Sequence, residues 1–274
     1  MTDHRAALGR YMEQFSGKKM MVAFSGGVDS SLLLAAACEA ASRWGGAQSQ
    51  VCAAMVHTRL HPAEDKEVAR RVAEEMGAQY LVCRIDELEE AGIGNNPVDR
   101  CYRCKRHLFT RLKEEAEKRG IDVILEGTNG DDLLVYRPGI RAVRELGIIS
   151  PLAELGFSKR EVRALAAEYG ISVADRPSAP CLATRFPYGT PLSYERMEQV
   201  DRGERFLKTF GFYNVRLRAH GDTARIEVDG KDMGIAVEHR EEIAAGIREL
   251  GFDYVTLDME GFRSGSMDVG IGRD

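Results

Sequence analysis

The sequence lacks the features that mark a membrane or secreted protein. No stretch of about 18 apolar residues occurs in the 274-residue chain, so no membrane-spanning helix is expected. The first residues, MTDHRAALGRYMEQF, do not follow the basic-then-apolar layout of a signal peptide. The six cysteines do not indicate a disulfide framework in a chain of this size. We therefore expect a cytoplasmic protein whose cysteines are buried thiols, metal ligands or nucleophiles.

An excess of basic residues is missing as well. Lysine and arginine number 38 against 43 acidic residues, which gives a net charge of -5. This balance argues against a general nucleic-acid surface, although a local basic pocket for phosphate is compatible with it. Internal repeats and low-complexity tails are also absent. With 44% hydrophobic and 30% charged residues, the composition is that of a soluble globular protein.

The first half of the chain alternates strands with helices. Strands are expected at 19–24, 51–56, 80–84 and 122–126, and helices at 4–16, 32–43, 62–76 and 105–118. This order predicts an α/β fold with a parallel sheet covered on both faces. Ligands of such sheets bind beyond the carboxyl ends of the strands, where the segments SGGVDSS and EGTNGDD both fall. The two segments are therefore expected to face one pocket.

The second half has a different pattern. A helical region at 151–169, with Ser158 as a cap, is followed by the proline-rich segment ADRPSAPCLATRFPYGTPLS, an ordered loop or domain junction. A small α+β unit follows, with helices expected at 195–210 and 234–250 and strands at 214–218, 224–228 and 254–258. We expect two domains, a nucleotide-binding domain at 1–185 and a substrate-binding or oligomerisation domain at 186–274.

The segment SGGVDSS, residues 25–31, has the features of a phosphate-binding loop. Its glycines allow a tight turn that exposes successive N–H groups, and the following helix adds its positive dipole end. The lysine-dependent P-loop, GxxxxGK[ST], is absent. The alternative is an ordinary glycine turn with a serine cap. The residues expected to hold ATP are Ser25, Gly26, Gly27, Asp29, Ser30 and Ser31, with Asp29 and Ser30 as catalytic candidates.

This segment resembles the PP-loop of the N-type ATP pyrophosphatases, which include GMP synthetase, NAD synthetase and tRNA thiolation enzymes. The resemblance implies cleavage of ATP between its α and β phosphates, with AMP left on a substrate oxygen. It also implies Mg²⁺, held by Asp29 or by Asp131 and Asp132, because that ion prefers oxygen ligands. A solvated turn is the alternative for Asp131 and Asp132. Gly127, Asn129 and Asp132 of EGTNGDD are expected to join the ATP site.

The cysteines fall into two groups. Cys38, Cys52 and Cys83 lie in apolar stretches and are expected to be buried as small hydrophobic residues. Cys101 and Cys104 form a CxxC pair, expected in a loop before a helix, where neighbouring basic residues and the helix dipole favour thiolates. A second CxxC is absent, so this pair cannot complete a four-cysteine zinc site.

Cys181 lies in the proline-rich loop between Arg176 and Arg185, whose charges are expected to lower the pKa of its thiol. A loop cysteine packed by prolines is the alternative. Three loop cysteines, at 101, 104 and 181, indicate three thiolate ligands. On a four-iron cluster, three ligands leave one iron open to carry a sulfide.

Several motifs together resemble one family, the LarE family of ATP-dependent sulfur transferases. These are SGGVDSS, NPVDRCYRCK, EGTNGDD, RPSAPCLATRFPYGTPLS, VRLRAHGDTARIEV and TLDMEGFRSGSM, which cover residues 15–270. The resemblance implies that a carboxylate of pyridinium-3,5-biscarboxylic acid mononucleotide is adenylated, and that sulfur then displaces AMP on the way to the nickel-pincer nucleotide. Members with a single cysteine at the position of Cys181 give up their own sulfur.

This chain departs from the single-cysteine pattern because it also has Cys101 and Cys104. It resembles the three-cysteine members, which bind a 4Fe–4S cluster and pass on a cluster-bound sulfide. Cys101, Cys104 and Cys181 are the expected ligands. Arg185 is expected at the ligand site, and Arg216 and Arg218, on one face of a strand, are expected to hold the substrate phosphate. A solvated strand face is the alternative for the last two.

Two other functions compete with this interpretation. One is a tRNA thiolase of the same superfamily, against which the acidic balance and the absence of a basic tail argue. The other is a non-catalytic iron–sulfur or zinc regulator that has kept an ATP-binding fold. The expected partners are a small nucleotide substrate and an unidentified sulfur donor, with no nucleic acid and no membrane. The chain is expected to form a homo-oligomer.

Overall fold

A computed structural model describes residues 3–44, 50–61, 64–135, 137–177, 180–263 and 265–267. The chain forms two compact units. Unit one comprises Met1–Thr58, Ala63–Gly92 and Asp99–Ser178, and unit two comprises Arg59–Pro62, Ile93–Val98 and Ala179–Asp274. This division differs from a single cut at residue 185, because two short segments of the first half belong to the second unit.

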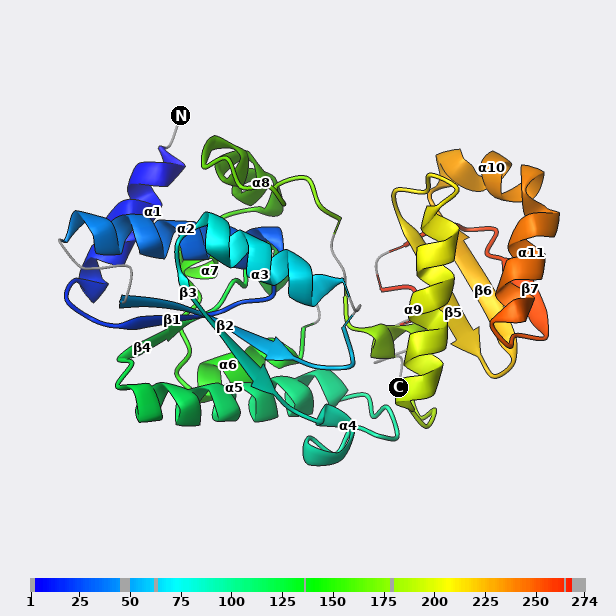
Figure 1. The fold of residues 1–274 in the computed structure, drawn as a ribbon, viewed down its shortest axis with the longest axis horizontal. Coiled ribbons are helices and arrows are strands. Elements are labelled where there is room, and N and C mark those ends of the chain that lie inside the picture. The colour runs from blue at the N-terminus through cyan, green and yellow to red at the C-terminus, as the bar shows by residue number, and fades with distance from the viewer. Residues whose placement is uncertain are drawn as a thin grey trace. The chain divides into compact units, whose positions relative to one another are not determined.

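A parallel four-stranded sheet forms the centre of unit one (Figure 1). The strand order is β3-β2-β1-β4, and the β1 strand pairs in parallel with both β2 and β4. The expected α/β fold with a parallel sheet is therefore confirmed. The strands are β1 (Met20–Ala23), β2 (Val51–His57), β3 (Gln79–Arg84) and β4 (Val123–Leu125).

Helices cover both faces of this sheet because alternate strand residues point to opposite sides. Met20 and Val22 pack in the core with the helices of one face, whereas Met21 packs with α5 and α6 on the other. The first face is covered by α1 (His4–Met12), α2 (Val28–Arg43), α3 (Asp65–Glu75), α7 (Pro151–Glu154) and α8 (Lys159–Glu168). The second face is covered by α5 (Arg100–Arg119) and α6 (Gly139–Glu145).

Two helices begin earlier than the sequence predicts. The α2 helix begins at Val28 rather than residue 32, because Gly27 is already extended at its N-cap and the Ser30 hydroxyl donates back to the Gly27 carbonyl. The α5 helix begins at Arg100 rather than residue 105, with Tyr102 N and Arg103 N both donating to the Asp99 carbonyl. The prediction of a loop at the CxxC pair was therefore wrong, and both cysteines lie in the first turns of α5.

Two expected helices are each divided into two. Gly156, at φ +70°, separates α7 from α8, and Ser158 then starts α8 with a capping box to Glu161. The expected cap at Ser158 is thus confirmed. The second division is at His239, between α10 (Met233–Glu238) and α11 (Arg240–Glu249). The short helix α4 (Glu87–Glu90) and α6 were not expected from the sequence.

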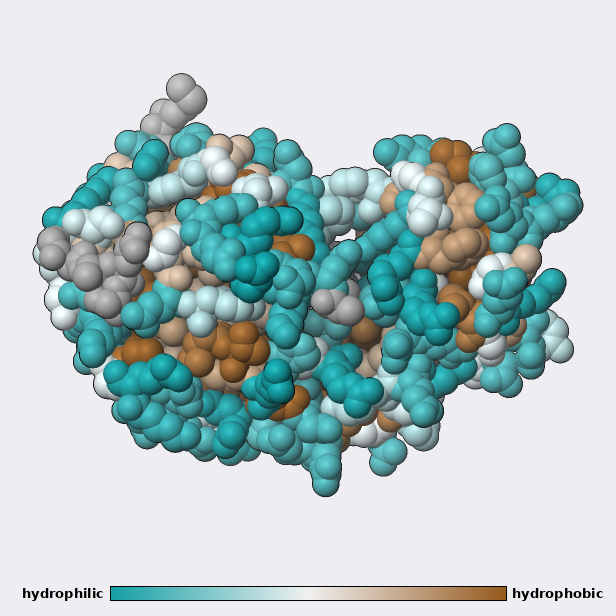
Figure 2. Space-filling view, in the orientation of Figure 1, coloured by the Kyte–Doolittle hydropathy of each residue, from teal (hydrophilic) through white to brown (hydrophobic). Residues whose placement is uncertain are grey.

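Unit two is built on a three-stranded sheet of order β5-β6-β7. The β5 strand (Val215–His220) is antiparallel to β6 (Thr223–Val228), which is parallel to β7 (Tyr254–Leu257). The α9 helix (Tyr194–Lys208) packs closely on this sheet, since a Cβ at Gly203 would lie 2.5 Å from Leu217 Cδ1. Figure 2 shows hydrophobic residues between α9 and α11. The expected small α+β unit is confirmed.

None of the described helices is both long enough and apolar enough to span a bilayer.

Candidate active site

The phosphate loop has a backbone that only glycine permits. Gly26 adopts φ +73°, and a Cβ there would lie 2.9 Å from the Ala69 Cα of α3. Gly27 is the N-cap of α2 and no side chain caps that helix start. The Ser30 hydroxyl lies 3.1 Å from the Ser25 hydroxyl, and Gly27 N donates to the Ser25 hydroxyl at 3.3 Å. The first turn of α2 therefore presents N–H groups and hydroxyls to an incoming anion.

The segment EGTNGDD closes on this loop from the end of β4. A Cβ at Gly127 would lie 2.9 Å from Ser30 N, so the two backbones are in contact. The Asn129 Nδ2 donates to Asp29 Oδ1 at 3.0 Å. Parallel strands end at the same edge of the sheet, which is why two segments about 100 residues apart meet here. The expected juxtaposition of the two segments is observed.

Lys159 is a further residue of this site. It is the first residue of α8, and its ammonium group forms an ion pair with Asp29 Oδ2. Its backbone N–H donates to Asp131 Oδ2 at 2.8 Å. A cation thus lies beside the phosphate loop, although the loop itself lacks the lysine of a P-loop. The sequence around Lys159 does not indicate a role in this site, because its only local signal, the cap at Ser158, predicts a helix start.

The acidic residues expected to hold Mg²⁺ already have partners. Both carboxylate oxygens of Asp29 are engaged, by Asn129 and by Lys159. Asp132 accepts from Asn129 N at 3.2 Å and forms an ion pair with Arg137 at 2.8 Å. The donor set is all oxygen, which suits Mg²⁺, but a metal ion would have to replace these cationic partners.

The CxxC pair lies near the same edge of the sheet as the ATP loops. Lys105, next to Cys104, places its Nζ 3.7 Å from Glu126 Oε2, and Glu126 immediately precedes Gly127. Both cysteines are partly exposed, and neither forms a disulfide bond. His107, three residues after Cys104, has its Nε2 3.0 Å from Glu90 Oε2. Cys101 and Cys104 thus occupy the first turns of a helix in the neighbourhood of the phosphate loop.

The other three cysteines are not suited to ionisation. Burial raises the pKa of the Cys38 and Cys52 thiols to about 11, and it also raises the pKa of Cys83. Cys52 in β2 is buried as expected, whereas Cys38 in α2 and Cys83 in β3 are only half-buried.

Cys181 precedes a 3₁₀ turn, Leu182–Arg185, in unit two. Its carbonyl accepts from Thr184 Oγ1 at 2.8 Å, and Arg185 Nη1 donates to the Pro180 carbonyl at 3.0 Å. The neighbouring Arg176 belongs to unit one, where its guanidinium donates to Asp65 at 2.7 Å. The two arginines expected to flank the thiol therefore both have other partners.

A buried network of arginines and glutamates lies beside this turn. Arg185 is 1% exposed and donates through Nε and Nη2 to both oxygens of Glu204, at 2.7 and 2.9 Å. Burial acts to raise the pKa of Glu204, but the charge and hydrogen bonds of Arg185, the charge of Arg216 and the Leu217 N–H together lower it. Arg218 donates to Glu227 at 2.8 Å and to the Thr184 carbonyl at 2.9 Å. The network thus connects the Cys181 turn to strand β5.

Arg216 is the arginine of this network whose positive charge is disfavoured by its surroundings. It is 6% exposed, and its guanidinium lies 5.1 Å from the centre of the Phe262 ring. Burial and, next, the charge of Arg185 lower the pKa of Arg216 to about 10. A bound anion would reverse this penalty. Arg216 and Arg218 share one face of β5, as expected, but the face is buried rather than solvated.

The described residues do not form a metal site that contains Cys101, Cys104 and Cys181 together. Among the described residues, no group of three or more His, Cys, Asp or Glu side chains lies in position to bind one metal ion. Cys101 and Cys104 belong to unit one and Cys181 to unit two.

The comparisons with known proteins agree with this arrangement. Residues 1–135 match the family model of the PP-loop domain. The chain is 37% identical to the pyridinium-3,5-bisthiocarboxylic acid mononucleotide synthase of Lactiplantibacillus plantarum, over 92% of this chain and 89% of that protein. It is also 37% identical to an uncharacterized protein of Synechocystis sp., over 94% of this chain and 95% of that protein.

A more distant similarity links the chain to RNA-modifying enzymes. It is 28% identical to the tRNA-specific 2-thiouridylase of Geotalea uraniireducens, over 82% of this chain and 69% of that protein. The phosphate loop, the segment that closes on it and the full-length similarity to the Lactiplantibacillus synthase together identify the family. The chain belongs to the LarE family of ATP-dependent sulfur transferases and carries the PP-loop domain of that family.

Proposed function

We propose that the enzyme adenylates carboxylates of pyridinium-3,5-biscarboxylic acid mononucleotide and converts them to thiocarboxylates for the nickel-pincer nucleotide cofactor. The observation that carries this proposal is the contact between the two halves of the ATP site. The backbone of Gly127 contacts the backbone nitrogen of Ser30. The Asp29 carboxylate accepts a hydrogen bond from Asn129 and forms an ion pair with Lys159. The family membership supplies the substrate class, through the name of the Lactiplantibacillus relative.

The chemistry explains why such a site is required. A carboxylate is a poor electrophile, and transfer of AMP to its oxygen makes it a good one. The carboxylate oxygen attacks the α-phosphorus, the bond to the β-phosphate oxygen breaks, and pyrophosphate leaves. Sulfur then attacks the carboxyl carbon, and the carbon–oxygen bond to AMP breaks. In this proposal the N–H groups at the start of α2 and the Lys159 ammonium hold the phosphates.

Unit two supplies a place for the phosphate of the mononucleotide. Arg216 and Arg218 lie on one buried face of β5 beside the Cys181 turn. We assign substrate phosphate binding to these two residues, and to Arg185 the task of holding Glu204 and the 180–184 backbone. Burial strengthens a charge-assisted contact, because competing water is excluded.

We further assign Cys101, Cys104 and Cys181 as the ligands of a 4Fe–4S cluster. None of the three forms a disulfide bond, and all are partly exposed. By contrast, Cys38 and Cys83 pack against the two apolar cores and Cys52 is buried. Three thiolate ligands would leave one iron of a four-iron cluster open. When bound, the cluster supplies sulfide for transfer. Sacrificial donation of the Cys181 sulfur is the competing route.

The proposal is tested with the anaerobically prepared enzyme, MgATP, sulfide and the dicarboxylate mononucleotide. Pyrophosphate release should require the mononucleotide, and mass spectrometry should show exchange of carboxylate oxygen for sulfur. Pyrophosphate release that depends on tRNA instead would favour the thiouridylase alternative, consistent with the more distant relatives. Absence of pyrophosphate release with any acid would favour a non-catalytic metal-binding regulator.

Alanine at Arg216 is expected to weaken binding of the mononucleotide about tenfold or more, with ATP affinity unchanged. A charge-assisted contact to phosphate contributes about 1.5–3 kcal/mol. Arg218→Ala should do the same, but it also leaves the buried Glu227 without this partner, so its melting temperature must be compared. Isothermal titration with each ligand measures both affinities.

The matched control is Arg205→Ala, which removes an exposed arginine of the same unit that is paired with Asp201. Its mononucleotide affinity should equal that of the wild type. Unchanged mononucleotide affinity in both folded variants, Arg216→Ala and Arg218→Ala, would make these arginines purely structural.

A further inference from the structure

One edge of the β7 strand has no partner strand in the described part of the chain. It pairs with β6 on one side, and no strand within the described ranges pairs with the other side. The N–H groups of Tyr254 and Asp258 donate to carbonyls on the β6 side. Because successive peptide groups alternate, Val255 and Leu257 turn their N–H and C=O groups to the open side. The strand contains neither lysine nor proline, the residues that commonly blunt such edges.

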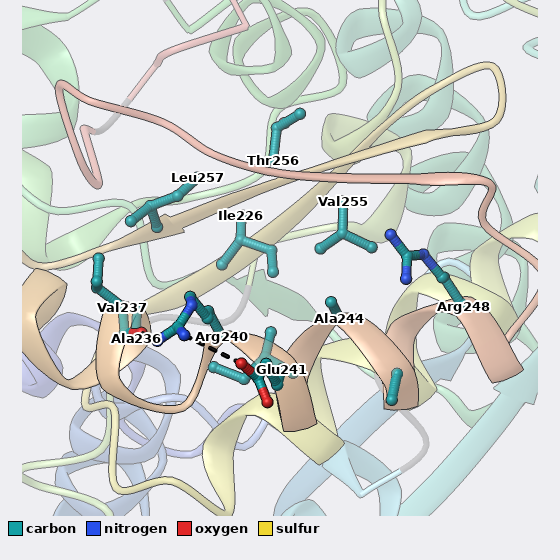
Figure 3. Close-up of a pocket in the computed structure, with 12 residues that line it drawn as sticks. Ile226, Ala236, Val237, Arg240, Glu241, Ala244, Arg248, Val255, Thr256 and Leu257 are labelled. Carbon is teal, nitrogen blue, oxygen red and sulfur yellow. Dashed lines mark hydrogen bonds and ion pairs between the residues drawn. The ribbon is translucent and has the colours of Figure 1, made fainter.

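An apolar groove of about 550 Å³ lies beside this edge, between β7 and α11 (Figure 3). Val237 at its rim is 54% exposed, and Tyr254 nearby is 67% exposed. Exposed apolar surface next to an open strand edge is typical of an interaction site. The apolar residues that line the groove include Ile226, Ala236, Val237, Ile243, Val255 and Leu257.

The face of α11 along this groove is complementary to itself. Glu241, Ala244, Ala245 and Arg248 follow the i, i+3, i+4, i+7 spacing of one helix face. The two alanines in the middle allow another helix to approach closely. One end carries the Glu241 carboxylate, which is 86% exposed and paired with the neighbouring Arg240 at 3.0 Å, and the other end carries Arg248. A second α11 in antiparallel orientation would place Glu241 against Arg248 at both ends.

A single two-fold axis can relate both the two β7 strands and the two α11 helices of a pair of copies. Antiparallel pairing of the open β7 edge with itself sets Val255 against Leu257, with the axis at Thr256. The antiparallel α11 pair has its axis between Ala244 and Ala245. Figure 3 shows that α11 and β7 run in opposite directions, since Leu257 lies toward Arg240 and Val255 toward Arg248.

The positions of these two axes agree. Thr256 lies about 7 Å along the strand from Tyr254, at about 3.3 Å per residue. The midpoint of the alanine pair lies about 7 Å along α11 from Glu249, at about 1.5 Å per residue. Glu249 and Tyr254 are joined by the short connection 250–253. Both axes therefore lie at about the same distance from this connection, one measured along β7 and the other along α11.

We propose that β7 and α11 form a two-fold contact between two copies of this chain. The two three-stranded sheets then become one six-stranded sheet, with two α11 helices side by side on the same face. The pairing covers the open edge and the groove, and it matches charges at both ends of α11. This contact is independent of the proposed function and of the metal content of the enzyme.

The test is the mass of the intact chain in solution, measured by size-exclusion chromatography with light scattering. The wild type should have twice the chain mass of 30.4 kDa, or an even multiple of it. Val255→Pro removes an outward N–H and one apolar side chain of the groove but leaves the ladder to β6 intact, and it should halve the mass. Glu241→Arg places like charges together and should also halve it.

The charge swap decides the outcome if the proline variant folds poorly. The double variant Glu241→Arg/Arg248→Glu restores opposite charges across the axis and should recover the mass of the wild type. The matched control is Val82→Lys on β3, an edge strand of the sheet in unit one, which should change nothing. A monomeric wild type, an assembly that resists both Val255→Pro and Glu241→Arg, or dissociation by Val82→Lys alone would each overturn the proposal.

Discussion

Replacing Asp29 or Ser30 with alanine is expected to abolish ATP-dependent pyrophosphate release. Asp29 is the point where the two ATP segments and α8 meet, through Asn129 and Lys159. Ser30 connects Ser25 and Gly27 by its hydroxyl. Loss of one preorganised group that stabilises developing charge lowers turnover about a hundredfold or more. A coupled assay for pyrophosphate, with the mononucleotide present, measures the loss.

Loss of stability cannot account for an effect of this size. The Asp29–Lys159 ion pair is partly exposed, and such pairs contribute about 1 kcal/mol or less to folding. Two controls match the substitutions. Ser42→Ala removes a hydroxyl at the other end of α2, and Asp122→Ala removes a carboxylate that accepts from Lys19 N. Both controls should keep full activity. Near-normal turnover in folded Asp29→Ala or Ser30→Ala would withdraw the assignment of the phosphate loop.

The double variant Cys101→Ala/Cys104→Ala is expected to lose iron and repeated turnover. Prepared without oxygen, the wild type should contain about four irons per chain and absorb visible light, as a 4Fe–4S cluster requires. It should complete several turnovers with added sulfide. The variant should do none of these, because Cys181 alone cannot hold a cluster. Iron analysis, absorbance and product counting measure the three properties.

The control is Cys38→Ala/Cys83→Ala, which also removes two thiols, but thiols whose pKa is raised by burial. Its iron content should equal that of the wild type. A wild type free of iron, in which Cys181 loses the mass of hydrogen sulfide after one turnover, would contradict the cluster assignment. That result would establish sacrificial donation.

The parts of the site that adjoin strands could be predicted from the sequence. SGGVDSS and EGTNGDD follow apolar runs, and parallel strands necessarily end at one edge. The shared face of Arg216 and Arg218 followed from the two-residue period of a strand. In these places a local pattern determines a position in space, and the structure agrees with it.

The parts that depend on contacts between distant segments could not be predicted. Lys159 is 130 residues from Asp29, and no local pattern connects the two. Burial of Arg216 and Arg218 depends on α9, which supplies Glu204, and on Glu227 of β6. The start of α5 was misplaced because the basic sequence around the CxxC pair gives no apolar period before Phe109. Hydrophobic periodicity reports packing, and a polar first turn has little of it.

Residues 59–62 and 93–98 affect how the C-terminal unit can be exchanged between related genes by recombination. Leu60 accepts from Leu182 N at 2.7 Å, and Asn96 Nδ2 donates to the carbonyls of Phe186 and Pro187. Unit two is therefore assembled from three separate stretches of the gene rather than from a single terminal one. One recombination event after residue 178 would join a foreign C-terminal stretch to the resident segments 59–62 and 93–98. Exchange of the C-terminal unit between relatives thus leaves two of its three stretches behind in the N-terminal half, which favours descent of the whole chain as one piece.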